Sequence, residues 1–169
     1  MKKFVCYLLI LLSSAFLSAC GGGGSNTSAP SRTLKSVIKP TALTAVMNVA
    51  TIQLSITVPL GVSPLLPEGK TELIDAIEII NSTDHVVNNK TLKSVTYTAA
   101  TSATVPGQIT VGVVQADGFK EADEITIHMK VDTGAFPKES DFTLLSFDAH
   151  DTAGATLALD PALTTTLLY

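Results

Sequence analysis

Two stretches of this chain alternate polar and apolar residues without a fault, over residues 51–58 and 124–131. Successive side chains of a β-strand point to opposite faces of a sheet, so a period of two predicts strands with one buried face. Residues 108–113 and 94–98 repeat the pattern over shorter lengths. We expect these four stretches to be half-buried strands, and the rest of the fold must accommodate them.

Four further stretches are weaker strand candidates because their alternation is less regular: 34–38, 42–49, 142–149 and 162–168. Residues typical of turns separate the candidates, at 59–67, 106–107, 117–118, 132–134, 151–154 and 160–161. About eight or nine short strands joined by turns predict an all-β fold, a single antiparallel β-sandwich of jelly-roll-like form.

Residues 72–80 do not follow this scheme. Leu73, Ile74 and Ile77 would share one face of a short helix, whereas the β-branched content also suits an irregular strand. Periodicity alone cannot assign so short an apolar run. The neighbouring strands favour a strand, and a short helix stays open as the alternative.

The N-terminus has the pattern of a secretory signal. Lys2 and Lys3 precede an apolar run over 5–16, which is too short and interrupted to span roughly 30 Å of hydrocarbon. The four residues that follow, Leu17, Ser18, Ala19 and Cys20, resemble the lipobox, the signal-peptidase site of bacterial lipoproteins. The resemblance implies a signal peptide over 1–19 and lipidation of Cys20. The alternative is an ordinary signal cleaved at the same small residues, with Cys20 incidental.

Lipidation would make the membrane a partner of the protein through the lipid on Cys20, stably so if two or more acyl chains are attached. Gly21 stands where lipoproteins retained in the inner membrane of enteric bacteria carry Asp, so the resemblance implies the outer membrane. Exposure to the periplasm or to the exterior stays open. Cys6 lies within the signal, so no disulfide can form in the mature chain, and stability must come from a packed core.

Residues 20–36 are mostly Gly, Ser, Asn, Thr, Ala and Pro, which predicts a flexible tether after the lipidated Cys20, with an end-to-end distance of about 20 Å. A single domain is predicted over 37–169. After the signal, nine Lys and Arg residues face fifteen Asp and Glu residues, a net charge of about −6. This balance disfavours nucleic acid and anionic lipid head groups as partners.

The order of features in the second half of the chain resembles that of cohesin-type domains. The features are a strand opening at 106–111, an alternating strand over 125–131, a late strand over 142–147, and an Asp-x-x-Gly turn within 148–154. The resemblance extends over 51–168. It implies a β-sandwich of a superfamily that also contains carbohydrate-binding modules, and a role in protein recognition through one sheet face. It transfers no partner-contact residue, so the ligand-binding residues stay unknown.

Two clusters of titratable residues suggest metal sites at first sight. Asp148, His150 and Asp151 stand close in sequence, and a strand would place Asp148 and His150 on one face. Two loose ligands beside a turn do not make a zinc site. Residues 117–124 contain four carboxylates, yet their spacing is not that of a calcium loop, and we expect an acidic surface loop. The other histidines, His85 and His128, have no spacing that links them. We predict no metal and no cofactor.

The function that we expect is non-enzymatic protein recognition by a lipid-anchored domain. The chain has no Gly-x-Ser-x-Gly and no Ser-x-x-Lys motif, so we assign no catalytic residue. A structural subunit of an envelope or filament assembly is the alternative, because exposed sheet edges can pair between copies. Polysaccharide binding is disfavoured, because the chain lacks Trp and the only tyrosines after the signal are Tyr97 and Tyr169.

Overall fold

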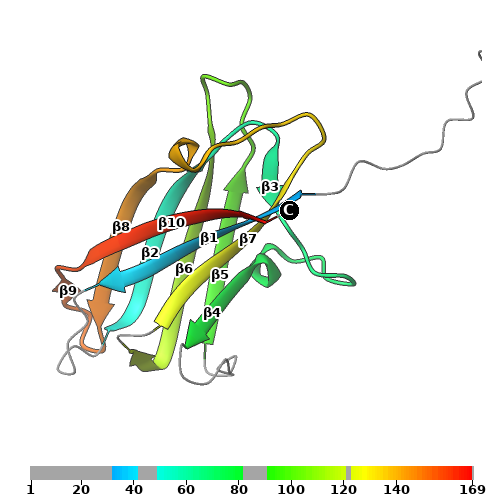
Figure 1. Ribbon diagram of the computed structural model, residues 1–169. Helices are drawn as coiled ribbons and strands as arrows, with labels where there is room; N and C mark the ends of the chain where they lie inside the picture. Colours follow the sequence, from blue (N-terminus) through cyan, green and yellow to red (C-terminus); the bar gives the residue numbers. More distant parts are fainter. Residues whose placement is uncertain (1–31, 42–48, 82–90, 121–122, 169) are drawn as a thin grey trace, which may run out of the picture.

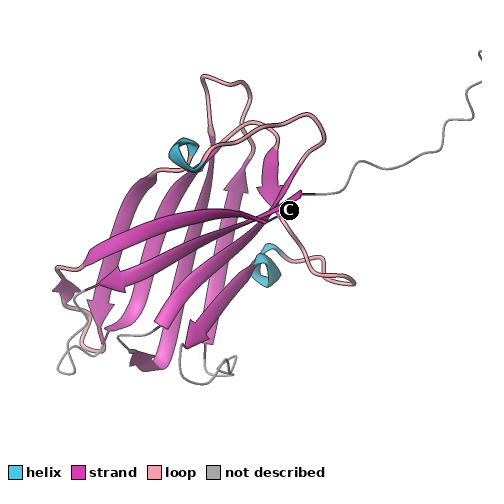
Figure 2. Ribbon diagram, in the orientation of Figure 1, coloured by secondary structure: helices cyan, strands magenta, loops and turns pink. Residues whose placement is uncertain are grey.

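The structure is a computed structural model that describes residues 32–41, 49–81, 91–120 and 123–168. Within these ranges ten strands form two five-stranded antiparallel sheets (Figures 1 and 2). The predicted all-β antiparallel sandwich is confirmed. Two single-turn 3-10 helices, η2 (Leu73–Ala76) and η3 (Glu139–Asp141), lie in the connections.

The first sheet, sheet A, is built around β7, which pairs with a long strand on one side and with two short strands on the other. Its members in spatial order are β10 (Asp160–Leu168), β1 (Arg32–Thr41), β7 (Asp123–Val131), and then β3 (Val62–Pro64) and β4 (Ile77–Asn81) along the same edge of β7.

The second sheet, sheet B, has β6 and β2 at its centre. Its members in spatial order are β5 (Thr91–Thr98), β6 (Gly107–Phe119), β2 (Val49–Val58), β8 (Leu144–Asp151) and β9 (Thr156–Leu157).

The strictly alternating stretches supply the centre of the core. Ile52, Leu54 and Ile56 of β2 are fully buried, and so are the matching apolar residues of β6 and β7. Each such side chain contributes about 1.5–3 kcal/mol when it leaves water. Branched aliphatic residues fill the space between the sheets, as the period of two predicts.

The domain begins earlier than predicted. Strand β1 starts at Arg32, so residues 32–36 belong to the sandwich and not to the tether, and the predicted boundary at residue 37 is wrong. Leu34, Ser36 and Ile38 are buried in alternation, and β1 pairs with β10 on one side and β7 on the other. The weaker strand candidate 34–38 therefore lies within a central strand that is longer than predicted.

The ambiguous residues 72–80 are neither all strand nor all helix. A 3-10 turn over Leu73–Ala76 leads directly into β4, and the N–H of Ile77 caps the turn by donating to the carbonyl of Ile74. Both sequence-based alternatives therefore apply in succession. Of the strand candidate 42–49, only Val49 lies within the described residues, where it opens β2.

Two predicted turns lie inside strands. Gly118, of the predicted turn 117–118, has φ +75° and lies within β6, where the register with β2 shifts between Val49 and Thr51. It therefore forms part of a bulge, a place where glycine's left-handed conformation is common. Pro161, of the predicted turn 160–161, pairs with Pro40 in β10. β10 is an edge strand, where proline is tolerated because no N–H is required on the open side.

Candidate functional site

The outward positions of β5, of β6 as far as Ala116, and of β2 carry no charged side chain, and we call this surface the uncharged face. The next residue of β6, Asp117, is exposed at its border. The side chains of this face alternate along the three strands with buried core residues. The register aligns them in rows across the sheet, so that Leu92, Val114 and Thr51 are neighbours, followed by Ser94, Gly112 and Gln53 and then by Thr96, Thr110 and Ser55.

Leu92 and Val114 form an exposed apolar pair within the uncharged face. They are direct register partners on β5 and β6, and they are 72% and 42% exposed to solvent. Neither is among the buried residues of the core. Exposed apolar contacts on a surface depleted of charge are typical of the centre of a protein–protein interface.

Gly112 makes a shallow hollow beside this pair. A Cβ at this position would lie 2.6 Å from the Ser94 hydroxyl oxygen, so a larger residue would displace that side chain. The hollow measures about 300 Å³ and is bordered by Leu92, Gln53 and Ser94. Its size suits a single aliphatic side chain of a partner, with hydroxyl and amide groups around it as hydrogen-bonding partners.

Strand β8 forms the margin of the uncharged face. His150 pairs with Thr51 and Asp148 pairs with Gln53, so these two side chains continue the rows outward from the centre. Asp151 has a different role, because its Oδ1 accepts the N–H groups of Ala153 and Ala155 at 2.8 Å each in the following turn. The structure therefore separates the three members of the Asp148, His150 and Asp151 cluster.

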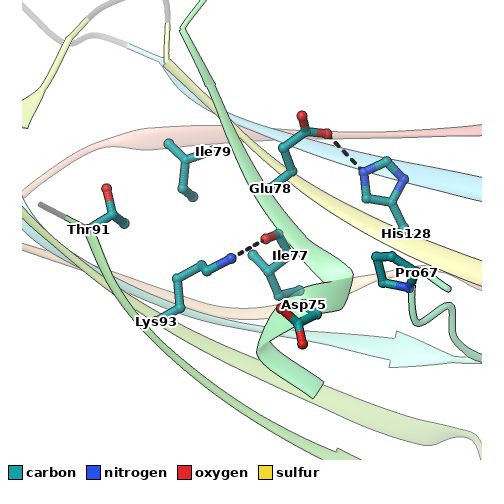
Figure 3. Close-up of a pocket in the computed structure, with 8 residues that line it drawn as sticks. All are labelled: Pro67, Asp75, Ile77, Glu78, Ile79, Thr91, Lys93 and His128. Carbon is teal, nitrogen blue, oxygen red and sulfur yellow. Dashed lines mark hydrogen bonds and ion pairs between the residues drawn. The ribbon is translucent and has the colours of Figure 1, made fainter. Parts of the chain in front are cut away.

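A second cavity of about 360 Å³ opens between the edge strands β4 and β5, and we call it the edge cleft (Figure 3). Two polar contacts line it. The Lys93 ammonium donates to the carbonyl oxygen of Ile77 at 2.6 Å, and Nε2 of His128 lies 2.9 Å from Oε2 of Glu78. Pro67, Ile77 and Ile79 supply its apolar wall.

The edge cleft has a structural role that its contacts explain. Lys93 belongs to sheet B and Ile77 to the free edge of sheet A, so their hydrogen bond joins the two sheets across the open side of the sandwich. Tyr97 lies four residues after Lys93 on β5 and makes a second contact between the sheets. Its hydroxyl donates to the carbonyl oxygen of Val62 at 2.8 Å. A lysine over a free edge also discourages edge-to-edge association.

Desolvation lowers the pKa of Lys93, and the nearby carboxylates of Asp75 and Glu78 partly oppose this effect. The cleft therefore holds an amine and a His–Glu pair, but its lining includes no Ser or Cys that a base could activate. Among the described residues no group of three or more His, Cys, Asp and Glu side chains is arranged to hold a metal ion.

Residues 117–124 differ from the predicted acidic surface loop in one respect. Asp123 is buried at the start of β7, its Oδ2 accepts the N–H of Lys120 at 2.9 Å, and burial raises the pKa of its carboxyl. Its Oδ1 is buried without a hydrogen-bond partner in the described part of the chain. The carboxylate is therefore a structural cap of the turn, while Asp117 and Lys120 are exposed.

The remaining sequence-based site residues lie outside the described residues: Leu17, Ser18, Ala19, Cys20 and His85. The uncharged face itself was missed by the sequence-based predictions. Its signal was Leu92 and Val114, two apolar residues on the otherwise polar phase of their strands. The pairing of β5 with β6, which brings these two residues together, could not be predicted from the sequence.

The fold defines the class of protein, an all-β antiparallel sandwich of two five-stranded sheets. No protein-family model, no curated protein and no solved structure matches this chain significantly. None of the helices in the described ranges is long and apolar enough to cross a membrane.

Proposed function

We propose that this chain is a lipid-anchored, non-enzymatic envelope protein that recognises another protein through its uncharged face. The anchor rests on the lipobox-like Leu17 to Cys20, and Gly21 favours the outer membrane. The recognition role rests on the Leu92–Val114 pair, which is exposed on the uncharged face beside the β5 edge of sheet B.

The chemistry of the face indicates the kind of partner. A complementary surface would present an aliphatic or aromatic side chain to the hollow at Gly112 and polar groups to Gln53, Ser94 and Thr96. Serine, threonine and glutamine can both donate and accept, so such a surface tolerates several hydrogen-bonding arrangements. The cohesin-type resemblance, which implies recognition through a sheet face, agrees with this proposal.

The alternatives have less support from the geometry. Assembly through sheet edges is opposed at β4 by Lys93, which occupies the Ile77 carbonyl, and at β10 by Pro161. A sugar-stacking platform would require an outward aromatic ring, whereas the Tyr97 hydroxyl is bound to Val62 between the sheets.

A photo-crosslinking amino acid placed at position 92 of the full-length protein in its own envelope tests the proposal. We expect one discrete adduct with a second protein, and we expect Val114→Lys to abolish it. The matched control is the same crosslinker at position 130, an exposed site on the opposite sheet. Equal adducts from both positions, an adduct only with another copy of this chain, or no adduct would contradict protein recognition through this face.

A further inference from the structure

The end of the sandwich at which β1 begins has a concentration of exposed apolar side chains. Seven large apolar residues of the described ranges are exposed, and four of them lie here: Leu60, Val105, Phe136 and Leu168. We call these four residues the tether-end patch. Phe136 is 79% exposed, and the other three are about half exposed.

The contacts of Arg32 place this patch beside the entry of the chain into the domain. The Arg32 guanidinium donates to the carbonyl of Ala135 and lies 5.0 Å from the centre of the Phe136 ring. Thr33, the next residue, pairs with Leu168. Arg32, where β1 begins, therefore lies next to Phe136.

Three loops contribute to this end, and a hydrogen bond joins two of them. The N–H of Asp132 donates to the carbonyl of Gly61 at 2.8 Å, which joins the β7–β8 connection to the β2–β3 turn. Leu60, Pro106 and Phe136, from three different connections, line one open groove of about 480 Å³. The apolar side chains thus come from loops that border one groove, with Pro59, Pro106 and Pro137 limiting backbone freedom.

The charges around the patch nearly cancel. Two positive residues, Arg32 and Lys138, lie near three negative ones, Asp132, Glu139 and Asp141. The Asp141 carboxylate also accepts the backbone N–H of Lys138 at 2.8 Å. A surface of this kind gains little from anionic head groups, and any affinity for a bilayer must come from apolar burial.

We infer that the tether-end patch inserts into the surface of the lipid bilayer to which Cys20 is anchored. The inference rests on the proposed anchor. Cys20 and Arg32 are twelve residues apart, so the chain between them spans at most about 42 Å. A tether that enters beside Phe136 brings this end closest to the bilayer and raises its local concentration there, so weak apolar contacts suffice.

Insertion would also orient the domain. The strands of sheet B run between the tether end and the opposite end (Figure 1). A membrane contact at the tether end would therefore leave the uncharged face of this sheet roughly parallel to the bilayer normal. That face then stays open to a partner that lies in the same envelope layer.

The chain contains no Trp, so a single Phe136→Trp substitution gives a unique fluorescent probe at the patch. The full-length lipidated protein is reconstituted into vesicles of zwitterionic lipid, with or without brominated acyl chains. In vesicles without bromine, we expect the emission of the introduced indole to shift to the blue. In brominated vesicles, we expect most of this emission to be quenched. Quenching should be unchanged between about 0.05 and 0.5 M salt, and Leu60→Ser should weaken it.

The matched control is Ala153→Trp, an exposed turn position at the opposite end of the sandwich, which should keep its emission. Flotation of the same vesicles reports the anchor separately. An unquenched Phe136→Trp protein that floats overturns the inference and leaves the anchor intact. Equal quenching of both probes also overturns the inference. So does a patch probe whose emission shifts to the blue only when envelope protein is added. A protein that does not float contradicts the anchor, and the inference with it.

Discussion

Lys93 of β5 donates from its ammonium nitrogen to the carbonyl oxygen of Ile77 of β4, 2.6 Å away, and thereby links the edges of the two sheets. Desolvation lowers the pKa of Lys93 in the folded protein, so the unfolded chain binds this proton more tightly. Stability contributed by this residue therefore rises as the pH increases from the lowered pKa toward 10.5, the ordinary value for lysine.

The substitution Lys93→Met tests this linkage. At neutral pH the loss of one hydrogen bond and the relief of desolvation oppose each other, so we expect a change in unfolding free energy within about 1 kcal/mol. As the pH rises toward 10.5, wild type should gain stability relative to the variant. Urea unfolding of both proteins across this range measures the difference, and parallel curves would exclude the linkage.

Tyr97→Phe removes the second contact between the sheets, the 2.8 Å hydrogen bond to Val62. We expect a cost of about 1 kcal/mol at neutral pH. Burial, followed by the charge of Asp132, raises the pKa of Tyr97, so its stabilising effect is complete below 10.0 and is lost as the pH rises through the raised value. Denaturant titrations should show the two proteins converging at high pH, with Thr96→Ser as the neighbouring control.

Asp123 gives a prediction of the same sign as Tyr97, but at acid pH. Burial raises the pKa of its carboxyl above 3.8, so protonation stabilises the fold and this stability is lost as the pH rises through the raised value. Asp123→Asn keeps an oxygen for the Lys120 N–H and should match or exceed wild-type stability at neutral pH. Asp123→Ala should lose about 1–2 kcal/mol. Thermal unfolding of the three proteins in mildly acid and in neutral buffer compares them, and an Asp123→Asn protein as unstable as Asp123→Ala would contradict this account of the carboxyl.

A pair of substitutions on one strand tests the assignment of core and surface. Leu54→Ala removes a fully buried side chain and should cost about 2–5 kcal/mol. Gln53→Ala changes the adjacent outward residue and should alter stability by less than about 0.5 kcal/mol. Chemical denaturation measures both changes. Equal losses of unfolding free energy would contradict the assignment of Leu54 to the core and Gln53 to the surface.

The sequence predicted the parts of the fold that depend on local alternation. Strands β2, β6 and β7 follow from it because each places aliphatic residues at every second position. Only residues 34–38 of β1 were indicated, and weakly, because Ser36 is a buried polar residue, hydrogen bonded to Thr165 at 3.1 Å, a partner that is distant in sequence. Gly118 resembled a turn because a bulge and a turn require the same left-handed backbone.

The candidate sites depend on register and loop packing, which no local pattern encodes. Leu92 and Val114 meet only because β5 and β6 pair as they do. Arg32 lies over the ring of Phe136, a residue far along the chain. Such juxtapositions arise from the three-dimensional arrangement of the sheets, so their members looked like isolated exposed residues in the sequence.

The anchor at Cys20 underlies both proposals, and mass spectrometry of the mature N-terminus together with membrane fractionation tests it most directly. We predict that the protein in the membrane fraction begins at Cys20 with a lipid modification, and that Cys20→Ser no longer sediments with membranes. An unmodified N-terminus, or a Cys20→Ser protein that fractionates like the parent, would contradict the account.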